Sequence, residues 1–440
     1  MVKIIKDNDI EKYLSKIKIR ASEDYKNIYD IVDSILQDVK INKDAALKRY
    51  TREFDNVDLD RLEVTEAEIG NAFKTIDKEL LDAIKEAKNN IQAFHLKQKN
   101  TGYKFKPKGD DILLGQLIRP IEKVGIYIPG GRAAYPSTVL MNAIPAKIAG
   151  VEELIMITPP KADGSVENSV LAAASLAGVD RIFKVGGAQG IGALAYGTES
   201  IPRVYKITGP GNIYIAAAKR IVSGIVGTDI IAGPSEILII ADKNANPSYI
   251  AADMISQAEH DEMAASILIT DSFSLSEKVQ KELKKQLQSL KRRNIAEKSL
   301  KNQGVIIITD SLEQCIDLAN EIAPEHLELM VKNPFDIYEK IKNAGAIFIG
   351  EYSPEPIGDY FAGPNHTLPT SGTAKFSSAL SVDDFMKKTS LIYYNEKALS
   401  ESASKIICFA ESEGLGGHAN AIKIRMKELL DEEGNGESDD

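Results

Sequence analysis

The strongest constraint on the fold is a regular alternation of strand-like and helix-like segments in the middle of the chain. Strand-like apolar runs occur at Glu153–Ile157, Arg181–Val185, Arg203–Ile207, Glu236–Ala241, Ala265–Ile269, Val305–Ile308, Leu327–Val331 and Ala346–Ile349. Helix-like runs alternate with them at about 166–177, 189–196, 212–224, 275–290, 311–322 and 335–343. Strands joined by such helices form parallel sheets covered on both faces. We therefore expect an α/β fold with two doubly wound, incomplete Rossmann-like parallel-sheet modules, flanked by helical N-terminal and C-terminal segments.

The predicted domain organisation has five parts. Residues 1–25 form an N-terminal helical segment, residues 26–123 with 236–380 form a first α/β module, and residues 124–235 form a second. Residues 381–430 form a C-terminal helical segment, and the acidic residues 431–440 form a disordered tail.

Composition narrows the class of protein. The chain has 440 residues, 43% hydrophobic and 27% charged, which is typical of a globular protein with well-formed cores. A net charge of −10 argues against a nucleic-acid binder. The first residues lack the apolar core of a signal peptide, and no apolar run approaches the roughly 20 residues of a membrane span. With two cysteines, Cys315 and Cys408, a disulfide framework is not expected, and a cytoplasmic location fits.

Histidine is rare in this chain and concentrated in short polar segments. Four of the five histidines, His260, His326, His366 and His418, lie beside Gln, Glu, Asp or Gly. Imidazole is a common zinc ligand and the usual proton shuttle near neutral pH, so this pattern predicts a metal site next to an acid–base group. The fifth, His95, lies in a polar run and is expected to be a solvated helix residue.

Gln257 and His260 are the first candidate metal pair. Asn246 followed by Pro247 is typical of a helix start, which places the pair near the end of that helix. Residues three apart lie on one face and can present an amide oxygen and an imidazole nitrogen to one ion. Two cysteines cannot build a cysteine-based zinc site, so zinc would need His, carboxylate or amide ligands. The alternative is that the pair makes structural hydrogen bonds.

Glu325 and His326 are the candidate acid–base pair. Pro324 should end the preceding helix, which places both residues on the turn before Leu327. Histidine can exchange a proton at neutral pH, and glutamate can hold or activate a water molecule. The alternative is that they are two exposed polar residues on a connection.

Asp359 and His366 lie in a polar segment after the last predicted strand. Ligands of open α/β sheets usually bind beyond the carboxyl ends of the strands, where this loop is expected. The alternative is an ordinary turn, because Asp, Asn, Gly and Pro are all turn formers.

Two glycine-containing turns each follow a strand and open a helix. They are Val185-Gly-Gly-Ala-Gln189 and Thr208-Gly-Pro-Gly-Asn212. Such turns direct backbone N–H groups and a helix N-terminus towards anions, so they predict phosphate binding. The run Gly190-Ile-Gly-Ala-Leu-Ala195 matches a Rossmann fingerprint, but we expect it inside the helix. No acidic residue lies between Ser200 and Thr228 to hold a ribose hydroxyl.

Together these motifs resemble the histidinol dehydrogenase family over nearly the whole chain. The resemblance rests on the segments Val124–Gly131, Val185–Gln189, Thr208–Asn212, Ala232–Glu236, Ser256–Asp261, Ala323–Leu327, Gly358–His366 and Glu413–His418. It implies oxidation of L-histidinol to L-histidine, the last step of histidine biosynthesis, in two NAD-dependent steps. It also implies a homodimer with one zinc ion per subunit. A paralogue that oxidises another amino alcohol is the alternative.

The resemblance also implies roles for individual residues. The zinc ligands would be Gln257, His260, Asp359 and His418, and Glu325 and His326 would be the acid–base residues. The substrate would contact Ser235, Gln257, His260, His326, Asp359, His366, Glu413 and His418, and NAD would contact Tyr127, Gln189 and Asn212. The first α/β module would then carry the zinc and acid–base residues, and the second would be the NAD side. The C-terminal segment would reach the partner's site, so that Glu413 and His418 act in trans.

Two other functions fit parts of the pattern. An aldehyde dehydrogenase-like enzyme would need a reactive thiol, but Cys315 and Cys408 both lie in apolar contexts and are expected to be buried. A non-catalytic zinc-dependent binding protein could use the same residues, but it would leave the Glu325–His326 pair without a purpose.

Overall fold

The structure is a computed structural model that describes residues 2–20, 26–130, 134–230 and 233–435. The chain divides into two compact units. The first comprises Met1–Lys99 and Ile121–Phe385, and the second comprises Asn100–Pro120 and Met386–Asp440. No helix in the described ranges combines the length and apolar character needed to cross a membrane.

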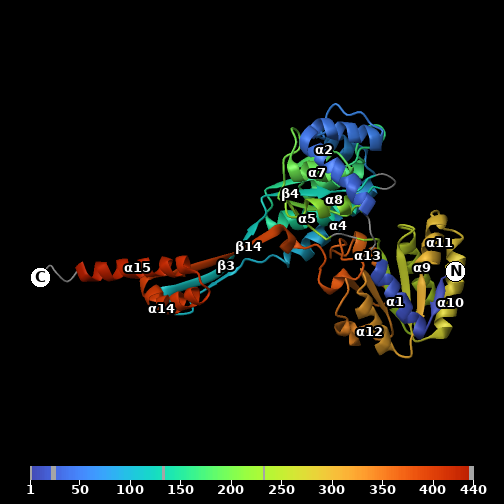
Figure 1. The fold of residues 1–440 in the computed structure, drawn as a ribbon. Coiled ribbons are helices and arrows are strands. Elements are labelled where there is room, and N and C mark those ends of the chain that lie inside the picture. The colour runs from blue at the N-terminus through green and yellow to red at the C-terminus, as the bar shows by residue number, and fades with distance from the viewer. Residues whose placement is uncertain (1, 21–25, 131–133, 231–232, 436–440) are drawn as a thin grey trace. The chain divides into compact units, whose positions relative to one another are not determined.

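Among the described residues, the first unit contains a six-stranded and a five-stranded parallel sheet (Figure 1). The six-stranded sheet has the order β1 (Lys3–Ile5), β11 (Val305–Ile308), β10 (Ala265–Thr270), β9 (Glu236–Ala241), β12 (His326–Met330) and β13 (Ala346–Ile349). The five-stranded sheet has the order β6 (Arg181–Lys184), β5 (Glu153–Thr158), β4 (Lys123–Tyr127), β7 (Lys206–Thr208) and β8 (Gly227–Thr228). These two sheets confirm the predicted α/β class.

Each sheet contains one point at which the strand order reverses. From β9 the chain adds β10 and β11 on one side and then β12 and β13 on the other. In the same way, β5 and β6 lie on one side of β4, and β7 and β8 on the other. Ligand sites of open parallel sheets form at such reversals, which lie here between β9 and β12 and between β4 and β7.

Alternating side chains of the six-stranded sheet pack into two cores, one on each face. Ile237 and Ile239 pack with one face, whereas Leu238 and Ile240 pack with the other, as the two-residue period of a strand requires. The first face is covered by α9 (Pro247–Ala258), α10 (Phe273–Leu287) and α11 (Arg293–Asn302), and the second by α1 (Asn8–Arg20) and α12 (Leu312–Ile322). Where a helix is predicted near 335–343, the chain forms two short 3₁₀ turns.

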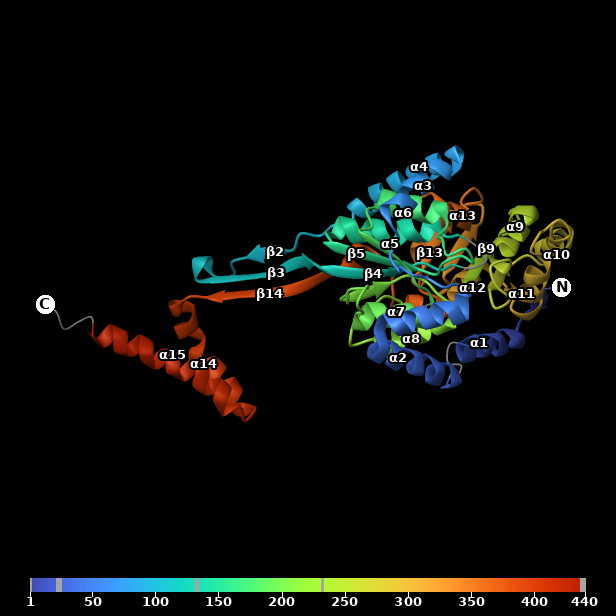
Figure 2. The same ribbon diagram turned by 90° about the horizontal axis from the view of Figure 1, so that it is seen from above.

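The five-stranded sheet is also covered on both faces. The helices α2 (Lys26–Tyr50), α7 (Gly187–Tyr196) and α8 (Ile213–Val222) share one core and lie side by side in Figures 1 and 2. The other face is covered by helices that pack against one another. They are α3 (Glu66–Thr75), α4 (Lys78–Leu96), α5 (Pro136–Ala149) and α6 (Asn168–Ala177).

This arrangement differs from the predicted grouping of residues 26–123 with the first module. Helix α2 packs on the five-stranded sheet because its apolar residues Leu36 and Val39 meet Gly192 of α7, where the absence of a side chain allows close approach. Periodicity predicts that such a helix has a buried face but does not say which sheet it covers.

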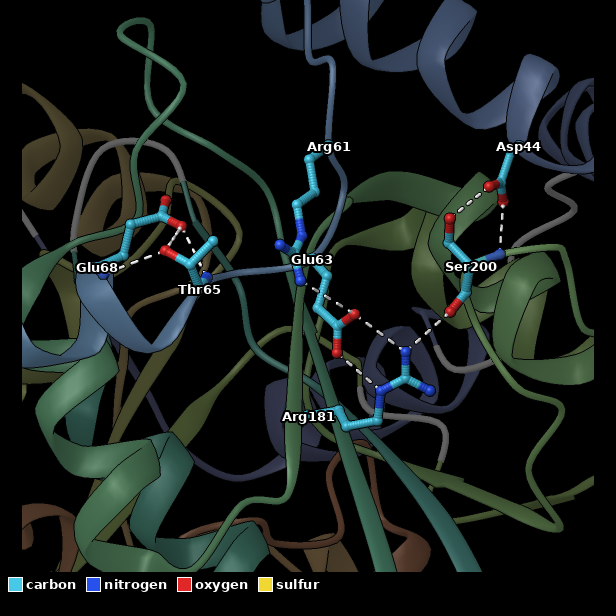
Figure 3. A network of polar contacts seen from close by, with 7 residues as sticks. All are labelled: Asp44, Arg61, Glu63, Thr65, Glu68, Arg181 and Ser200. Carbon is cyan, nitrogen blue, oxygen red and sulfur yellow. Dashed lines mark hydrogen bonds and ion pairs between the residues drawn. The ribbon is translucent and has the colours of Figure 1, made fainter.

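The segment between α2 and α3 also belongs to the five-stranded sheet. It runs antiparallel beside β6, where Val64 N–H donates to the Ile182 carbonyl. Figure 3 shows the guanidinium of Arg181 bound to both carboxylate oxygens of Glu63, at 2.8 and 3.1 Å. In the same figure, Thr65 and Glu68 form the capping box that begins α3. These contacts lie at the β6 edge of the sheet.

The ends of the chain also differ from expectation. Residues 3–5 of the predicted N-terminal helical segment form β1, which pairs with β11. The helix α15 (Gly416–Asn435) includes residues 431–435 of the predicted disordered tail. Residues 436–440 of that tail lie outside the described residues.

The second unit combines an antiparallel sheet with two helices. The sheet has the order β14 (Met386–Tyr394), β3 (Ile112–Pro120) and β2 (Tyr103–Phe105), and α14 (Glu396–Ser412) and α15 pack together. The predicted helical segment 381–430 contains α14 and α15, but it also contains the strand β14, which was not predicted. Most of this strand is exposed, so it lacks the apolar alternation by which a strand is identified.

Candidate functional site

The candidate metal centre lies at the amino edge of the six-stranded sheet, beside the reversal between β9 and β12. His326 is the first residue of β12, and Glu236 is the first residue of β9. Asp359 reaches His326 from α13 (Glu355–Tyr360), and their Oδ1 and Nε2 atoms are 3.8 Å apart. The polar segment around Asp359 is expected at the carboxyl ends of the strands, but α13 leads the chain back to the opposite edge.

His326 and Glu325 are both buried and face the same backbone. The Nδ1 atom of His326 lies 3.1 Å from the Glu236 carbonyl oxygen, and the Glu325 carboxylate accepts a hydrogen bond from the Glu236 N–H at 2.9 Å. A neutral His326 therefore carries its proton on Nδ1 and keeps the lone pair of Nε2 free. Among the described residues, Nε2 has no hydrogen-bond partner. The pair is thus oriented for proton transfer rather than exposed on a connection.

Burial and the surrounding charges shift the pKa values of Glu325 and His326. Burial raises the pKa of Glu325 to about 8, although the positive charge of His326 and the Glu236 N–H oppose the increase. Burial alone would lower the pKa of His326, but the carboxylates of Glu325 and Asp359 raise it to about 10. Burial would raise the pKa of Asp359, but contact with His326 and the charge of His366 hold it below its usual value.

His326, Glu355 and Asp359 form a triad that could hold a metal ion. One ligand atom from each residue lies within 4.8 Å of the others. Burial raises the pKa of Glu355 to about 7. His366 Nδ1 lies 3.0 Å from the Asp359 carbonyl oxygen, so the imidazole anchors the turn that carries this carboxylate. Glu355 is absent from the predicted site, because Pro354-Glu355 looks like an ordinary helix start with an acidic first turn.

Gln257 supplies the clearest sign that a ligand fits here. Its side chain is fully buried, and in the described part of the chain neither amide atom has a hydrogen-bond partner. Buried polar atoms are nearly always paired, so an unsatisfied amide indicates a missing ligand. Gln257 lies in the last turn of α9, and the N–H of His260 donates to its carbonyl one turn later. The donor set of amide, imidazole and carboxylate fits zinc.

Two further acids lie behind the triad and were not predicted. Glu328 on β12 accepts a hydrogen bond from the Glu355 N–H at 2.8 Å, and its carboxyl group also contacts Asp253 of α9. Both side chains are buried. A period of two along β12 places Glu328 on the same face as His326, which is the signal that could have identified it. These contacts link the strand and the two helices that carry His326, Asp359 and Gln257.

The candidate cofactor-binding residues lie at the carboxyl edge of the five-stranded sheet. Tyr127 ends β4, and Asn212 caps α8 by accepting hydrogen bonds from Tyr214 N–H and Ile215 N–H, so both flank the reversal between β4 and β7. Gln189 in the first turn of α7 is 1% exposed, and within the described residues both of its amide atoms lack partners. Gly190 lies inside α7 as expected, so the matching run does not form the strand-to-helix turn of a Rossmann fingerprint.

Other predicted site residues have different positions. Ser235 is half-buried directly before β9, and its carbonyl accepts a hydrogen bond from Ala265 N–H. Glu413 and His418 are exposed and belong to the second unit. Their contribution to the metal centre stays a prediction.

Two expectations about single residues are wrong. His95 is fully buried rather than solvated, and its Nδ1 atom lies 2.7 Å from Gln98 Oε1. Cys408 is exposed rather than buried. Cys315 is buried as expected, and burial raises its thiol pKa to about 11. A thiol with this pKa is a poor nucleophile at neutral pH, which disfavours the aldehyde dehydrogenase-like alternative.

Comparison with known proteins identifies the family. Residues 18–426 match the model of the histidinol dehydrogenase family. The chain is 53% identical to histidinol dehydrogenase of Clostridium acetobutylicum over 97% of this chain and 99% of that protein. It is 55% identical to histidinol dehydrogenase of Listeria monocytogenes over 90% of this chain and 92% of that protein. The crystal structure of histidinol dehydrogenase from Elizabethkingia anophelis superposes with a TM-score of 0.92, at 39% identity, covering 98% and 99% of the two chains. The chain therefore belongs to the histidinol dehydrogenase family, whose members are enzymes that oxidise histidinol to histidine in histidine biosynthesis.

Proposed function

We propose that this protein oxidises L-histidinol to L-histidine through a bound aldehyde, using two NAD molecules and one zinc ion per subunit. The observation that carries this proposal is the free Nε2 atom of a buried His326, which lies beside candidate metal donors and next to Glu325. We further propose that the enzyme is a cytoplasmic homodimer.

His326 is the general base of both oxidation steps. Its Nδ1–H donates to the Glu236 carbonyl, which fixes the ring and directs Nε2 towards the substrate hydroxyl. Nε2 takes the proton of the alcohol in the first step, releases it to solvent, and takes the proton of the aldehyde hydrate in the second. NAD, when bound, accepts the hydride in each step.

Glu325 activates the water molecule that hydrates the aldehyde. Its carboxylate is held by the Glu236 N–H, 3.6 Å from His326 Nδ1, so Glu325 and His326 are held by the same backbone unit. Keeping the aldehyde bound between the steps prevents its reaction with solvent amines.

Gln257, His260, Asp359 and His418 are the proposed zinc ligands. Zinc, when bound, would orient the substrate and offset the negative charge of Asp359, which otherwise favours the protonated form of His326. Ser235, His366 and Glu413 complete the proposed substrate contacts. Glu355 adds a buried carboxylate beside Asp359 that could take part in this site.

Tyr127, Gln189 and Asn212 are the proposed NAD contacts. The unpaired amide of Gln189 and the N-termini of α7 and α8 offer hydrogen-bond donors to the cofactor at a strand-order reversal.

Support for a homodimer comes from the second unit. On α14 and β14, Phe409 and Ile392 are 71% and 72% exposed in the single chain. Apolar side chains this exposed mark an association surface, and symmetric pairing of two identical chains is the commonest solution. We propose that this pairing delivers Glu413 and His418 to the partner's site.

The test is to incubate the purified protein with L-histidinol and NAD, with and without a chelator, and to count NADH per histidine formed. We expect about two NADH per histidine, with activity lost in the chelator and restored by zinc. Bound zinc without any NADH would contradict the proposal and favour a binding protein. NADH from another amino alcohol alone would indicate a paralogue.

A further inference from the structure

A fully buried ion pair lies beneath the candidate cofactor turn. Lys219 of α8 and Asp229, just after β8, form an ion pair, and their side chains are 3% and 1% exposed. Burial raises the pKa of Asp229, and the Lys219 ammonium opposes this increase. Replacing a buried ion pair with apolar groups is often neutral or stabilising, so global stability alone does not explain this pair.

The pair binds both polar backbone groups of Gly209. Lys219 Nζ donates to the Gly209 carbonyl at 3.1 Å, and Asp229 Oδ2 accepts from the Gly209 N–H at 2.7 Å. Gly209 has φ +119°, and a Cβ there would lie 2.1 Å from the carbonyl oxygen of Tyr127. The start of the Gly209–Asn212 turn is therefore held directly against the end of β4.

The same lysine also reaches the connection between the two sheets. Its ammonium donates to the Ile230 carbonyl at 3.1 Å. The next described residue is Gly233, whose N–H donates to Thr370, and Ser235 and Glu236 follow at the amino edge of the six-stranded sheet. One side chain thus binds both Gly209 of the cofactor turn and Ile230, which follows β8.

We infer that Lys219 and Asp229 are positioning residues for NAD, which act by holding Gly209 so that Tyr127 and Asn212 keep their relative placement. This inference rests on the proposed assignment of that turn to the cofactor. Neither residue is expected to touch NAD, because both are buried beneath the turn. Their loss should weaken NAD binding and leave the chemistry and the metal centre intact.

The test is the double variant Lys219→Met/Asp229→Asn, which removes both charges and keeps an acceptor for the Gly209 N–H. We expect the KM and Kd for NAD to rise at least about tenfold, because a displaced positioning group weakens binding by this order. The kcat at saturating NAD, the KM for histidinol and the zinc content should change by less than about twofold. Wild-type NAD affinity in a stable double variant would overturn the inference.

The matched control is Arg181→Met/Glu63→Gln. It removes another ion pair of the same module, shown in Figure 3, which joins β6 to the segment beside it. We expect its NAD affinity to be unchanged, and an equal loss would show general loosening of the module. If wild-type protein neither binds NAD nor reduces it, the proposed function fails, whatever the variants do.

Hydrogen exchange in the wild-type protein keeps the inference testable if the double variant does not fold. The Gly209 N–H should be strongly protected without NAD, because it donates to a buried carboxylate. Exchange at the rate of a free amide would show that the pair does not hold the turn.

Discussion

The two parallel sheets have the same kind of strand-order reversal, but their candidate sites lie at opposite edges. At the carboxyl edge of the five-stranded sheet, α7 and α8 begin beside Gln189 and Asn212. At the amino edge of the six-stranded sheet, α9 ends beside Gln257, and Asp359 lies in the last turn of α13. Helix N-termini carry partial positive charge and helix C-termini partial negative charge. One edge therefore suits the phosphates of a dinucleotide, whereas the other suits a cation. The direction of the helices, together with the sheet topology, therefore determines whether an edge suits an anion or a cation.

The largest expected effect is on catalysis at the amino edge. His326→Ala should lower kcat by about 10²- to 10⁴-fold, because it removes the general base. Histidinol binding and zinc content should change far less. Steady-state kinetics and metal analysis check this, and near-normal turnover would show that His326 is not the base.

Because the two candidate sites lie at different sheet edges, we expect substitutions at one edge to affect metal binding and substitutions at the other to affect NAD binding. Asp359→Asn should weaken zinc binding at least about tenfold and leave NAD affinity unchanged, because a charged donor is lost. Gln189→Ala should do the reverse, raising the Kd for NAD while zinc is retained. Metal titration and NAD-binding measurements on both variants test this prediction. It would be contradicted if each substitution weakened the binding of both ligands.

A smaller effect is expected from Asp55, which lies near Tyr127 in the five-stranded module. Burial raises the pKa of Asp55 to about 6, so the folded protein binds this proton more tightly than the unfolded chain does. Stability from this group is therefore present at low pH and is lost as pH rises from about 4 to about 6. Asp55→Asn should gain stability relative to wild type at pH 8 and not at pH 4. Thermal unfolding at both pH values measures this, and a difference that does not change with pH would contradict it.

The smallest expected effect is on activity after removal of both thiols. Cys315→Ser with Cys408→Ser should retain full turnover, because the buried Cys315 thiol, with a pKa of about 11, is a poor nucleophile and neither cysteine belongs to the candidate site. A modest loss of stability caused by the Cys315→Ser substitution would not contradict this prediction. Loss of turnover in a folded variant would revive the thiol mechanism.

The central strands could be predicted closely, whereas the pairing of outer segments could not. Residues 236–241, 305–308 and 346–349 form strands with the predicted bounds, because strands of a helix-covered parallel sheet are continuous apolar runs bounded by turns. The exposed strand β14 was missed because antiparallel pairing with β3 satisfies its backbone without a buried apolar face. Apolar patterns report burial, and this strand has little.

The candidate site was predicted in part. Glu325, His326, Gln257 and Asp359 could be singled out because polar side chains interrupt apolar runs at turns and helix ends. Glu355 and Lys219 could not, because an acid in a first helical turn and a lysine in a helix usually face solvent. Glu328 was missed although the two-residue period of β12 places it on the same face as His326. Only the tertiary contacts show that these charges are buried and which groups they bind.

By itself, the sequence determined the α/β class, two parallel sheets and the residue types of a metal and acid–base site, because these depend on local periodicity and on side-chain chemistry. Tertiary structure decided that α2 covers the five-stranded sheet, that His95 is buried and that His326, Glu355 and Asp359 meet at an amino edge. Those outcomes depend on which faces of distant segments pack together, and no local pattern encodes that choice.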